Sequence, residues 1–197
     1  RAITVADNKE EREEVNIFVY DYESNKSDEY KAKIFTYSKE FDVAILKIET
    51  ELDDKLKYSA KMIPKNELKN IRIFSKIYTI GCPLGNIPMP TQGEIISFLK
   101  EINDINFWMM NAPTIFGNSG GGVFLQGSNY LVGISSMVSV YDNVITMPVP
   151  HLSIILPLDK VYDWLDSQCL QFLYTTERTK AECDKMREDI KKSNPEL

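Results

Sequence analysis

Short runs of β-branched and aromatic residues recur along most of the chain, and turn-forming residues separate them. The separating segments, such as ESNKSDE, CPLGNIPMP and GNSGGG, are rich in glycine, proline, asparagine and serine. This succession of strand-like runs and turn segments predicts an all-β sandwich or barrel rather than alternating strands and helices. The runs are AITVA, VNIFVY, YKAKIFTY, DVAILKI, KIYTIG, GEIISFL, NFWMMNA, GGVFLQ, YLVGISSMV and HLSIILP.

The runs form two sets, before and after about residue 65, which indicates two barrels packed together. A helical spacing of apolar residues extends from Leu158 to Leu173. The charged segment that follows, TTERTKAECDKMREDIKKSNPEL, predicts a solvated helix that frays to a disordered end. A helix that binds a partner is the alternative for this segment.

Composition excludes several classes of function. The 197 residues are 43% hydrophobic and 26% charged, with a net charge of −6. The positive charges are scattered, so we expect no nucleic-acid surface and no anionic-membrane surface. No run approaches the length of a membrane span, and the opening residues RAITVADNKE lack the layout of a signal peptide.

Cysteines and acidic residues give no sign of a metal site. Cys82, Cys169 and Cys183 fall in no C-x-x-C spacing, so neither a zinc site nor a disulfide framework is predicted, and a cytoplasmic location is mildly favoured. The acidic stretch around residues 49–54 is better explained as a solvated loop, because nothing there fixes six oxygens around a cation. We therefore expect neither a metal nor a cofactor.

The segment IFGNSGGGVF, residues 115–124, places Ser119 in a glycine-rich turn. Such a backbone can point several N–H groups at one spot and hold an anion. A serine nucleophile needs an oxyanion site of this kind, together with a base and a group that orients the base. Convergence of the N–H groups of Gly117 and Ser119 would supply it. An ordinary hairpin turn has the same composition, so both interpretations stay open.

Asp42 stands immediately before an apolar strand in FDVAILKIE. A carboxylate at the entrance of a strand is usually a turn or cap residue. It could equally be the group that orients a catalytic imidazole.

Four stretches in order resemble trypsin-like serine proteases, and within them the HtrA branch: ITVAD, DVAILKI, IYTIGCPLG and NAPTIFGNSGGGVF. The similarity continues through YLVGISSMV and LSIILPLDKVYDWL, so that it covers residues 2 to 166. GNSGG and DVAIL together are the specific part of the resemblance. A peptide-binding PDZ domain is not expected in the residues that follow, which departs from the usual HtrA arrangement.

The resemblance implies an all-β fold of two antiparallel six-stranded barrels, with a cleft between them and a C-terminal helix. The first barrel would span about residues 1–65 and would be incomplete at its N-terminal end. The second would span about residues 70–158. Together they form a protease domain over residues 1–166, and residues 167–197 form the charged tail.

The resemblance also assigns roles to individual residues. Ser119 would be the nucleophile and Asp42 the orienting carboxylate. The oxyanion hole would be formed at Gly117, Asn118 and Ser119. Substrate would contact Pro113, Ser135, Ser136, Met137 and His151, with residues 135–137 pairing with the substrate backbone by strand addition. Because Pro113 at the pocket floor carries no charge, we expect small or medium apolar side chains there rather than lysine or arginine.

The family histidine is replaced in this alignment, because Asp7 ends the run ITVAD where the family has T-A-A-H. A carboxylate beside Asp42 cannot form the imidazolium that Asp42 would stabilise. The replacement could be natural or engineered, or the alignment could be wrong and the histidine could lie upstream of Arg1. His151, the only histidine in the chain, lies in the wrong place for the base.

These observations predict a serine endopeptidase that works through an acyl-enzyme on Ser119 and is inactive, or nearly so, because of Asp7. The alternative is a pseudoprotease that binds a partner through its cleft or its charged tail. In either case the expected partner is a peptide or protein in the inter-barrel cleft. The sequence predicts no particular oligomeric state.

Overall fold

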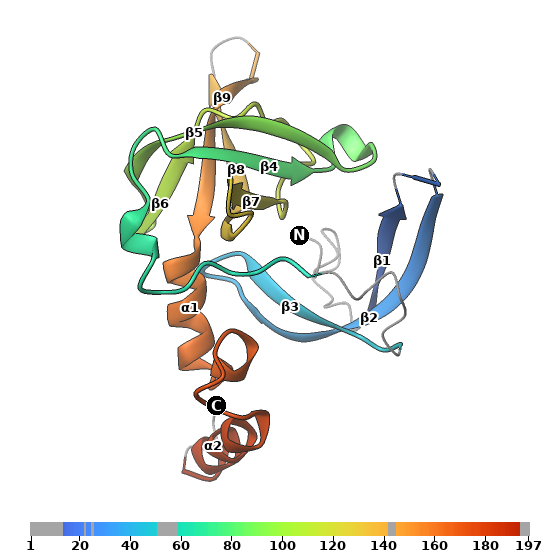
Figure 1. The fold of residues 1–197 in the computed structure, drawn as a ribbon, viewed down its shortest axis with the longest axis vertical. Helices are drawn as coiled ribbons and strands as arrows, with labels where there is room; N and C mark the ends of the chain where they lie inside the picture. Colours follow the sequence, from blue (N-terminus) through green and yellow to red (C-terminus); the bar gives the residue numbers. More distant parts are fainter. Residues whose placement is uncertain (1–13, 22, 25, 51–58, 142–144, 194–197) are drawn as a thin grey trace.

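A computed structural model describes residues 14–21, 23–24, 26–50, 59–141 and 145–193. The run AITVA and Asp7 lie outside these described residues. Figure 1 shows a curved sheet in the first part of the chain, a barrel in the second and two helices near the C-terminus. The expectation of an all-β chain with two antiparallel sheets and a C-terminal helix is confirmed.

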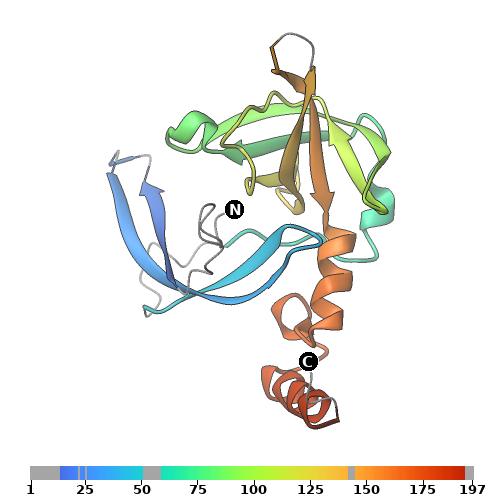
Figure 2. The same ribbon diagram turned by 180° about the vertical axis from the view of Figure 1, so that it is seen from behind.

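The first sheet has three antiparallel strands in the order β1-β2-β3. Their bounds are β1 Glu14–Asp21, β2 Lys26–Ser38 and β3 Val43–Ile48. In β1 half-buried and exposed residues alternate, as expected for a strand with one face on a core. Tyr30 and Ala32 of β2 are the buried side chains of this sheet. Figure 2 shows its curvature most clearly.

The second half is a closed six-stranded barrel in the order β4-β5-β6-β9-β8-β7, with every neighbouring pair antiparallel. Closure removes the free sheet edges that an open sheet would present. The strand bounds are β4 Lys76–Gly81, β5 Met89–Ile102, β6 Ile105–Met110, β7 Gly122–Leu125, β8 Leu131–Tyr141 and β9 Met147–Pro157.

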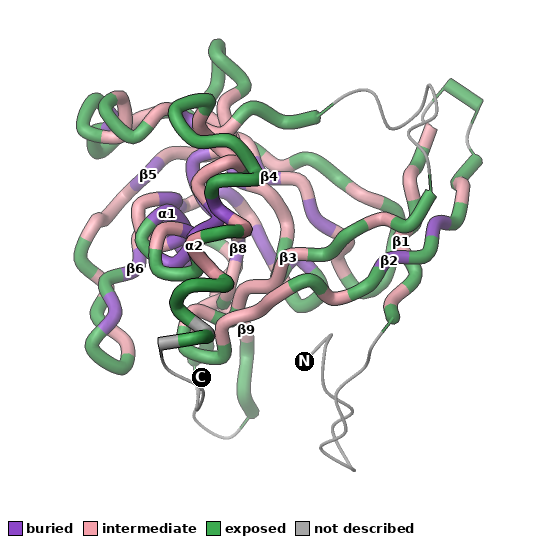
Figure 3. Tube along the Cα trace, turned by 90° about the horizontal axis from the view of Figure 1, so that it is seen from below, coloured by how far each residue is buried: buried purple, intermediate pink, exposed green. Residues whose placement is uncertain are grey.

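The main hydrophobic core fills this barrel. Figure 3 shows the buried residues concentrated in the barrel strands and in the first C-terminal helix. The barrel contributes fully buried aliphatic side chains from all its strands, which exclude water from the interior. Among them are Ile77, Ile95, Met110, Val123, Val132 and Ile155.

The turn between β2 and β3 joins the first sheet to this core. Phe41, Val43 and Ile45 are half-buried and pack against the barrel's core cluster. The linker is held to the barrel as well, since the N–H of Ile63 donates to the carbonyl oxygen of Leu131 over 3.0 Å. The two halves therefore share one packed interior.

Helix α1, Leu158–Ser167, continues directly from β9 and buries one face. That face carries Val161, Tyr162, Trp164 and Leu165. The segment expected to be one helix from Leu158 to Leu173 is interrupted after α1, and a short 3-10 helix, η3, occupies Gln171–Leu173.

Helix α2, Lys180–Ser193, lies at the opposite end of the molecule from the β8–β9 hairpin (Figure 1). Thr179 and Glu182 form a capping box, in which each side chain accepts a hydrogen bond from the other residue's N–H. Arg187 of α2 lies 5.3 Å from the ring centre of Phe35 in β2, so the helix contacts the first sheet. No helix in the described part of the chain is long and apolar enough to cross a membrane.

Candidate functional site

Ser119 lies in the loop between β6 and β7, and hydrogen bonds pin this loop to β8. The N–H of Gly120 donates to the carbonyl oxygen of Ser135 over 2.7 Å. The N–H of Ser135 returns a bond to the carbonyl oxygen of Gly121 over 2.8 Å. The loop is therefore an extension of the barrel framework rather than an isolated hairpin turn.

Gly117 can only be glycine at its position. Its φ is +100°, and an added Cβ would lie 2.4 Å from the carbonyl oxygen of Cys82. The neighbouring N–H of Leu84 donates to the carbonyl oxygen of Phe116 over 2.8 Å. The loop after β4 thus packs directly against the backbone that precedes Ser119.

Two of the three predicted oxyanion positions have unused donors. Within the described part of the chain the N–H groups of Gly117 and Ser119 donate to no other group, and both residues are exposed. The N–H of Asn118 instead donates to the carbonyl oxygen of Ile115 over 3.1 Å. An anion at this loop would therefore be bound by Gly117 and Ser119.

The Asn118 side chain turns into the protein. It is buried, and its Oδ1 accepts no hydrogen bond from the described residues. Gly81 of β4 leaves the space for it, because a Cβ on Gly81 would lie 2.7 Å from that oxygen. Asn118 therefore anchors the loop by packing.

The hydroxyl of Ser119 is exposed and donates to the carbonyl oxygen of Ser136 over 2.7 Å. Ser136 lies at a bulge in β8, where the register to β9 shifts between Ser135 and Met137. The structure thus brings Ser119 together with the predicted substrate-binding residues 135–137. Ser135 is buried, whereas Met137 is exposed.

Pro113 and His151 lie on two neighbouring segments of the barrel. The carbonyl oxygen of Pro113 accepts a bond from the Thr91 hydroxyl over 2.9 Å, and the N–H of Thr114 donates to the carbonyl oxygen of Pro150 over 3.0 Å. His151 is exposed, and its Nδ1 lies 3.1 Å from the backbone oxygen of Asn111. The contact holds the imidazole beside the end of β6.

Asp42 is exposed and ends the β2–β3 turn with a φ of +51°. No hydrogen bond among the described residues joins it to Ser119 or to His151. Because Asp7 lies outside the described residues, the structure gives no geometry for the predicted base position. Ser119 and residues 135–137 are therefore the part of the predicted site that the hydrogen bonds bring together.

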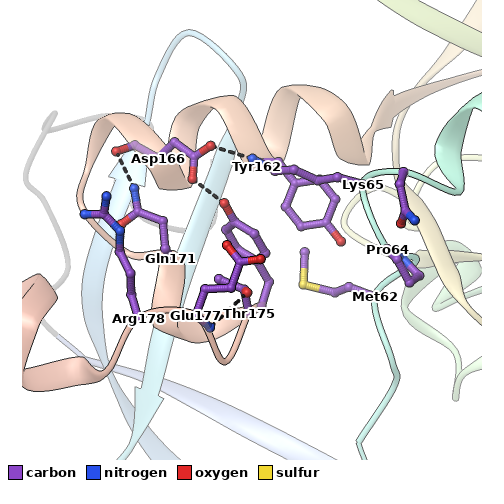
Figure 4. Close-up of a pocket in the computed structure, with 11 residues that line it drawn as sticks. Met62, Pro64, Lys65, Tyr162, Asp166, Gln171, Thr175, Glu177 and Arg178 are labelled. Carbon is purple, nitrogen blue, oxygen red and sulfur yellow. Dashed lines mark hydrogen bonds and ion pairs between the residues drawn. The ribbon is translucent and has the colours of Figure 1, made fainter.

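A hollow of about 760 Å³ lies elsewhere, where the linker meets α1 and the C-terminal segment (Figure 4). None of the predicted catalytic or substrate-binding residues lines it. Lys65 of the linker forms an ion pair with Asp166 of α1, at 2.5 Å between Nζ and Oδ2. Tyr174 donates to the other carboxylate oxygen of Asp166, and the Lys65 ammonium lies over the rings of Tyr162 and Tyr174.

These contacts shift the ionisation of the residues around the hollow. Burial raises the pKa of Asp166, but the hydrogen bonds from Lys65 and Tyr174 outweigh it and hold the pKa below its usual range. Burial, followed by the neighbouring Tyr174, raises the pKa of Tyr162 to about 12. Since Lys65 and Asp166 form an ion pair with each other, we interpret this cluster as a structural joint, a contact that holds the linker against the C-terminal segment.

The sequence gives no signal for this joint, because its partners are far apart in the chain and each has an ordinary local context. Lys65 and Asp166 are 101 positions apart. Only the packing of α1 beside the linker brings them together.

Comparison with known proteins identifies the family and the fold of the chain. A sequence model of the trypsin-like peptidase domain matches residues 3–134. No curated protein matches the chain. Among solved structures, the HtrA-type protease AlgW with a decapeptide is 20% identical and has a TM-score of 0.60, covering 77% of this chain and 43% of that one.

AlgW with a tripeptide is also 20% identical, with a TM-score of 0.59, and covers 81% of this chain and 49% of that one. The chain thus spans less than half the length of these two proteins. At this identity the similarity shows a shared fold.

Proposed function

The chain belongs to the trypsin-like peptidase domain family, and from this premise we propose that it is a serine endopeptidase domain whose nucleophile is Ser119. The observation that carries the proposal is the surroundings of the Ser119 hydroxyl. It is exposed, it lies beside β8, and two backbone N–H groups that donate to no described residue flank it. A serine in an ordinary hairpin turn would not need a glycine packed against Cys82 before it.

The reaction would be acyl transfer. The Ser119 oxygen would attack a peptide carbonyl, and the N–H groups of Gly117 and Ser119 would bind the oxyanion that forms. Each such donor contributes about 3–4 kcal/mol to transition-state stabilisation in enzymes where it has been removed. The peptide C–N bond would then break and the amine would leave carrying a proton. Water would hydrolyse the acyl-Ser119 ester, which releases the acid and restores the hydroxyl.

Asp7 would leave this site without a proton acceptor of the usual kind. We propose that it occupies the base position beside Asp42, where two carboxylates repel and cannot stabilise an imidazolium. The hydroxyl proton of Ser119 is directed at the Ser136 carbonyl, which is no base. Removal of one member of a triad still leaves roughly a thousandfold acceleration over water, so we expect trace activity.

The substrate would be an extended polypeptide that adds to β8 at residues 135–137. The uncharged Pro113 favours a small or medium apolar side chain beside the scissile bond. The similar AlgW structures carry a decapeptide and a tripeptide, which supports a peptide as the ligand class here.

A second function is favoured by the same hydrogen bond. Because the Ser119 hydroxyl is satisfied by Ser136, the site is complete as a binding surface without a base. In that case the protein would be a pseudoprotease that holds a peptide or protein partner without cleaving it.

Labelling with a fluorophosphonate probe separates the two functions. We expect Asp7→His to increase labelling strongly over the parent chain, with none in the Asp7→His, Ser119→Ala control. Equal and negligible labelling in all three proteins would favour the binding function. Strong labelling of the parent chain would mean that another residue is the base.

A further inference from the structure

Two exposed apolar side chains lie beside Gly117, which carries one of the two proposed oxyanion donors. Leu84 has an exposed fraction of 70% and Phe116 one of 55%. Their backbones are joined, because the N–H of Leu84 donates to the carbonyl oxygen of Phe116 over 2.8 Å. The two residues therefore present apolar surface to solvent immediately beside the loop that carries Ser119. Exposed apolar surface that gathers in one place usually marks a site of interaction.

Hydrogen bonds fix the backbone that carries Leu84. This residue lies in a short 3-10 turn, η2, Pro83–Gly85, which follows β4. Both the N–H and the side-chain amide of Asn86 donate to the carbonyl oxygen of Pro83, over 3.0 and 2.8 Å. The turn thus holds the Leu84 side chain at the surface. A side chain on a fixed backbone loses little freedom when a ligand covers it.

The loops that form this surface carry no charge. Residues 77–93, which include η2, contain no aspartate, glutamate, lysine or arginine, and neither do residues 105–141, which include Phe116. A charged ligand group would lose hydration here and find no opposite charge in either loop. The surface therefore favours an uncharged, apolar ligand group.

The loop that carries Ser119 contacts the barrel at two places. Ser119 bonds to Ser136 of β8, whereas Phe116 bonds to Leu84 beyond the end of β4. In the barrel, β7 lies between β8 and β4. Two strand spacings amount to about 10 Å, which is about three residues of an extended peptide. A peptide whose acyl part lies on residues 135–137 would therefore reach the second place with the residues that follow the attacked carbonyl.

We propose that Leu84 and Phe116 bind an apolar, uncharged side chain of the substrate, about one to three residues after the bond that Ser119 would attack. This inference rests on the proposed function, which places the acyl part of the peptide on residues 135–137. It adds a preference on the leaving side of that bond. The preference proposed for Pro113 concerns the acyl side, so the two can be tested separately.

Binding through this surface can be measured by fluorescence anisotropy without any cleavage. The probe is a labelled twelve-residue peptide of leucine, serine and glutamine. The variants are Phe116→Ser and Leu84→Asn, because asparagine tolerates the φ of +53° at Leu84. The matched control is Phe74→Asn. Phe74 also has a positive φ, +70°, and an exposed fraction of 71%, but it lies before the start of β4, at the opposite end of that strand from Leu84.

We expect Leu84→Asn and Phe116→Ser each to bind the peptide about tenfold more weakly than the parent, and Phe74→Asn to bind it equally well. Equal thermal midpoints would show that all four proteins are folded. Equal binding by the parent and both variants, or no binding by the parent, would overturn the inference. So would a dimer of the parent that Leu84→Asn dissociates, if no peptide binds.

The leaving side can be tested with the acylated Asp7→His protein. An amine bound on that side competes with water for the acyl group. Its nitrogen bonds to the acyl carbon, the ester bond to Ser119 breaks, and the Ser119 oxygen takes up the proton that the amine loses. We expect leucinamide to accept the acyl group about tenfold more efficiently than glycinamide, and the added change Leu84→Asn to remove this preference. A preference for leucinamide that Leu84→Asn leaves unchanged would overturn the inference.

Failure of the proposed function has a different signature. The Asp7→His protein would then form no acyl-Ser119 ester, whereas the anisotropy measurement would still show whether Leu84 and Phe116 bind the peptide.

Discussion

The Ser119 hydroxyl donates a hydrogen bond of 2.7 Å to the backbone carbonyl oxygen of Ser136. This bond connects the glycine loop to the bulge of β8, where a substrate backbone would be expected to bind. It also directs the serine proton at an acceptor that cannot remove it. This contact therefore positions the proposed nucleophile without removing its proton.

Replacing Ser119 by alanine should therefore have little effect on stability. The bond is exposed to solvent, and the loop keeps its backbone bonds to Ser135 and the packing of Asn118. We expect the free energy of unfolding in urea to fall by about 1 kcal/mol or less. A loss of several kcal/mol would mean that the hydroxyl is a structural group rather than a group available for chemistry.

Gly117→Ala should be much more damaging than an alanine at a comparable glycine. Gly127 has a similar φ of +95° but nothing within 4 Å of an added Cβ, so Gly127→Ala should cost about 1–2 kcal/mol from backbone strain alone. At Gly117 the Cβ would also collide with the Cys82 carbonyl. Urea denaturation should show a larger loss for Gly117→Ala, and equal losses would contradict the close packing of the two loops.

The ion pair between Lys65 and Asp166 predicts a pH dependence of stability. The lowered pKa of Asp166 means that its contribution is present above the unfolded value and is lost as pH falls through the folded pKa. The pKa of Lys65 is lowered by burial but raised more strongly by Asp166 and Tyr174, so its contribution is lost as pH rises above about 10.5.

Both side chains are partly exposed, so the pair should contribute no more than about 1 kcal/mol. Unfolding of the parent chain and of Asp166→Asn, followed from pH 2 to pH 7, should show a smaller decline on acidification for the variant. An identical decline in both would show that Asp166 does not titrate with a lowered pKa.

We expect Tyr162 to ionise at a higher pH than an ordinary tyrosine. Its hydroxyl donates to the carbonyl oxygen of Ile63 over 2.5 Å, and its pKa is raised to about 12. Because the folded pKa is raised, this group stabilises the fold below about pH 10 and loses that contribution as the pH rises through about 12. Absorbance at the tyrosinate band should show that one tyrosine of the parent chain does not ionise near pH 10 with the others. The Tyr162→Phe variant should lack that late-ionising tyrosine. Ionisation of Tyr162 near pH 10 would contradict its burial.

The strands could be predicted from the sequence because each carries its own pattern. All nine expected runs in the described part of the chain form strands, from VNIFVY in β1 to HLSIILP in β9. The glycines before and after Ser119 also indicated a special backbone, since only glycine tolerates the φ and the close approach found at Gly117.

The long-range contacts of Ser119 and Asn118 leave no such pattern in the sequence. The Ser119 bond to Ser136 depends on a bulge in β8, and a hydrophobic alternation does not reveal where a bulge occurs. The burial of Asn118 depends on the space beside Gly81 in a strand far away in the sequence. These features arise from tertiary packing, so they appear only in the folded chain.

The most direct test of the account is the mass of the Asp7→His protein after incubation with an activated ester, with the modified residue located by peptide mapping. We predict one acyl group per chain, on Ser119, and a much slower modification of the parent protein. Acylation at another residue, or an unmodified Ser119 in a folded Asp7→His protein, would contradict the claim that Ser119 is a preserved nucleophile.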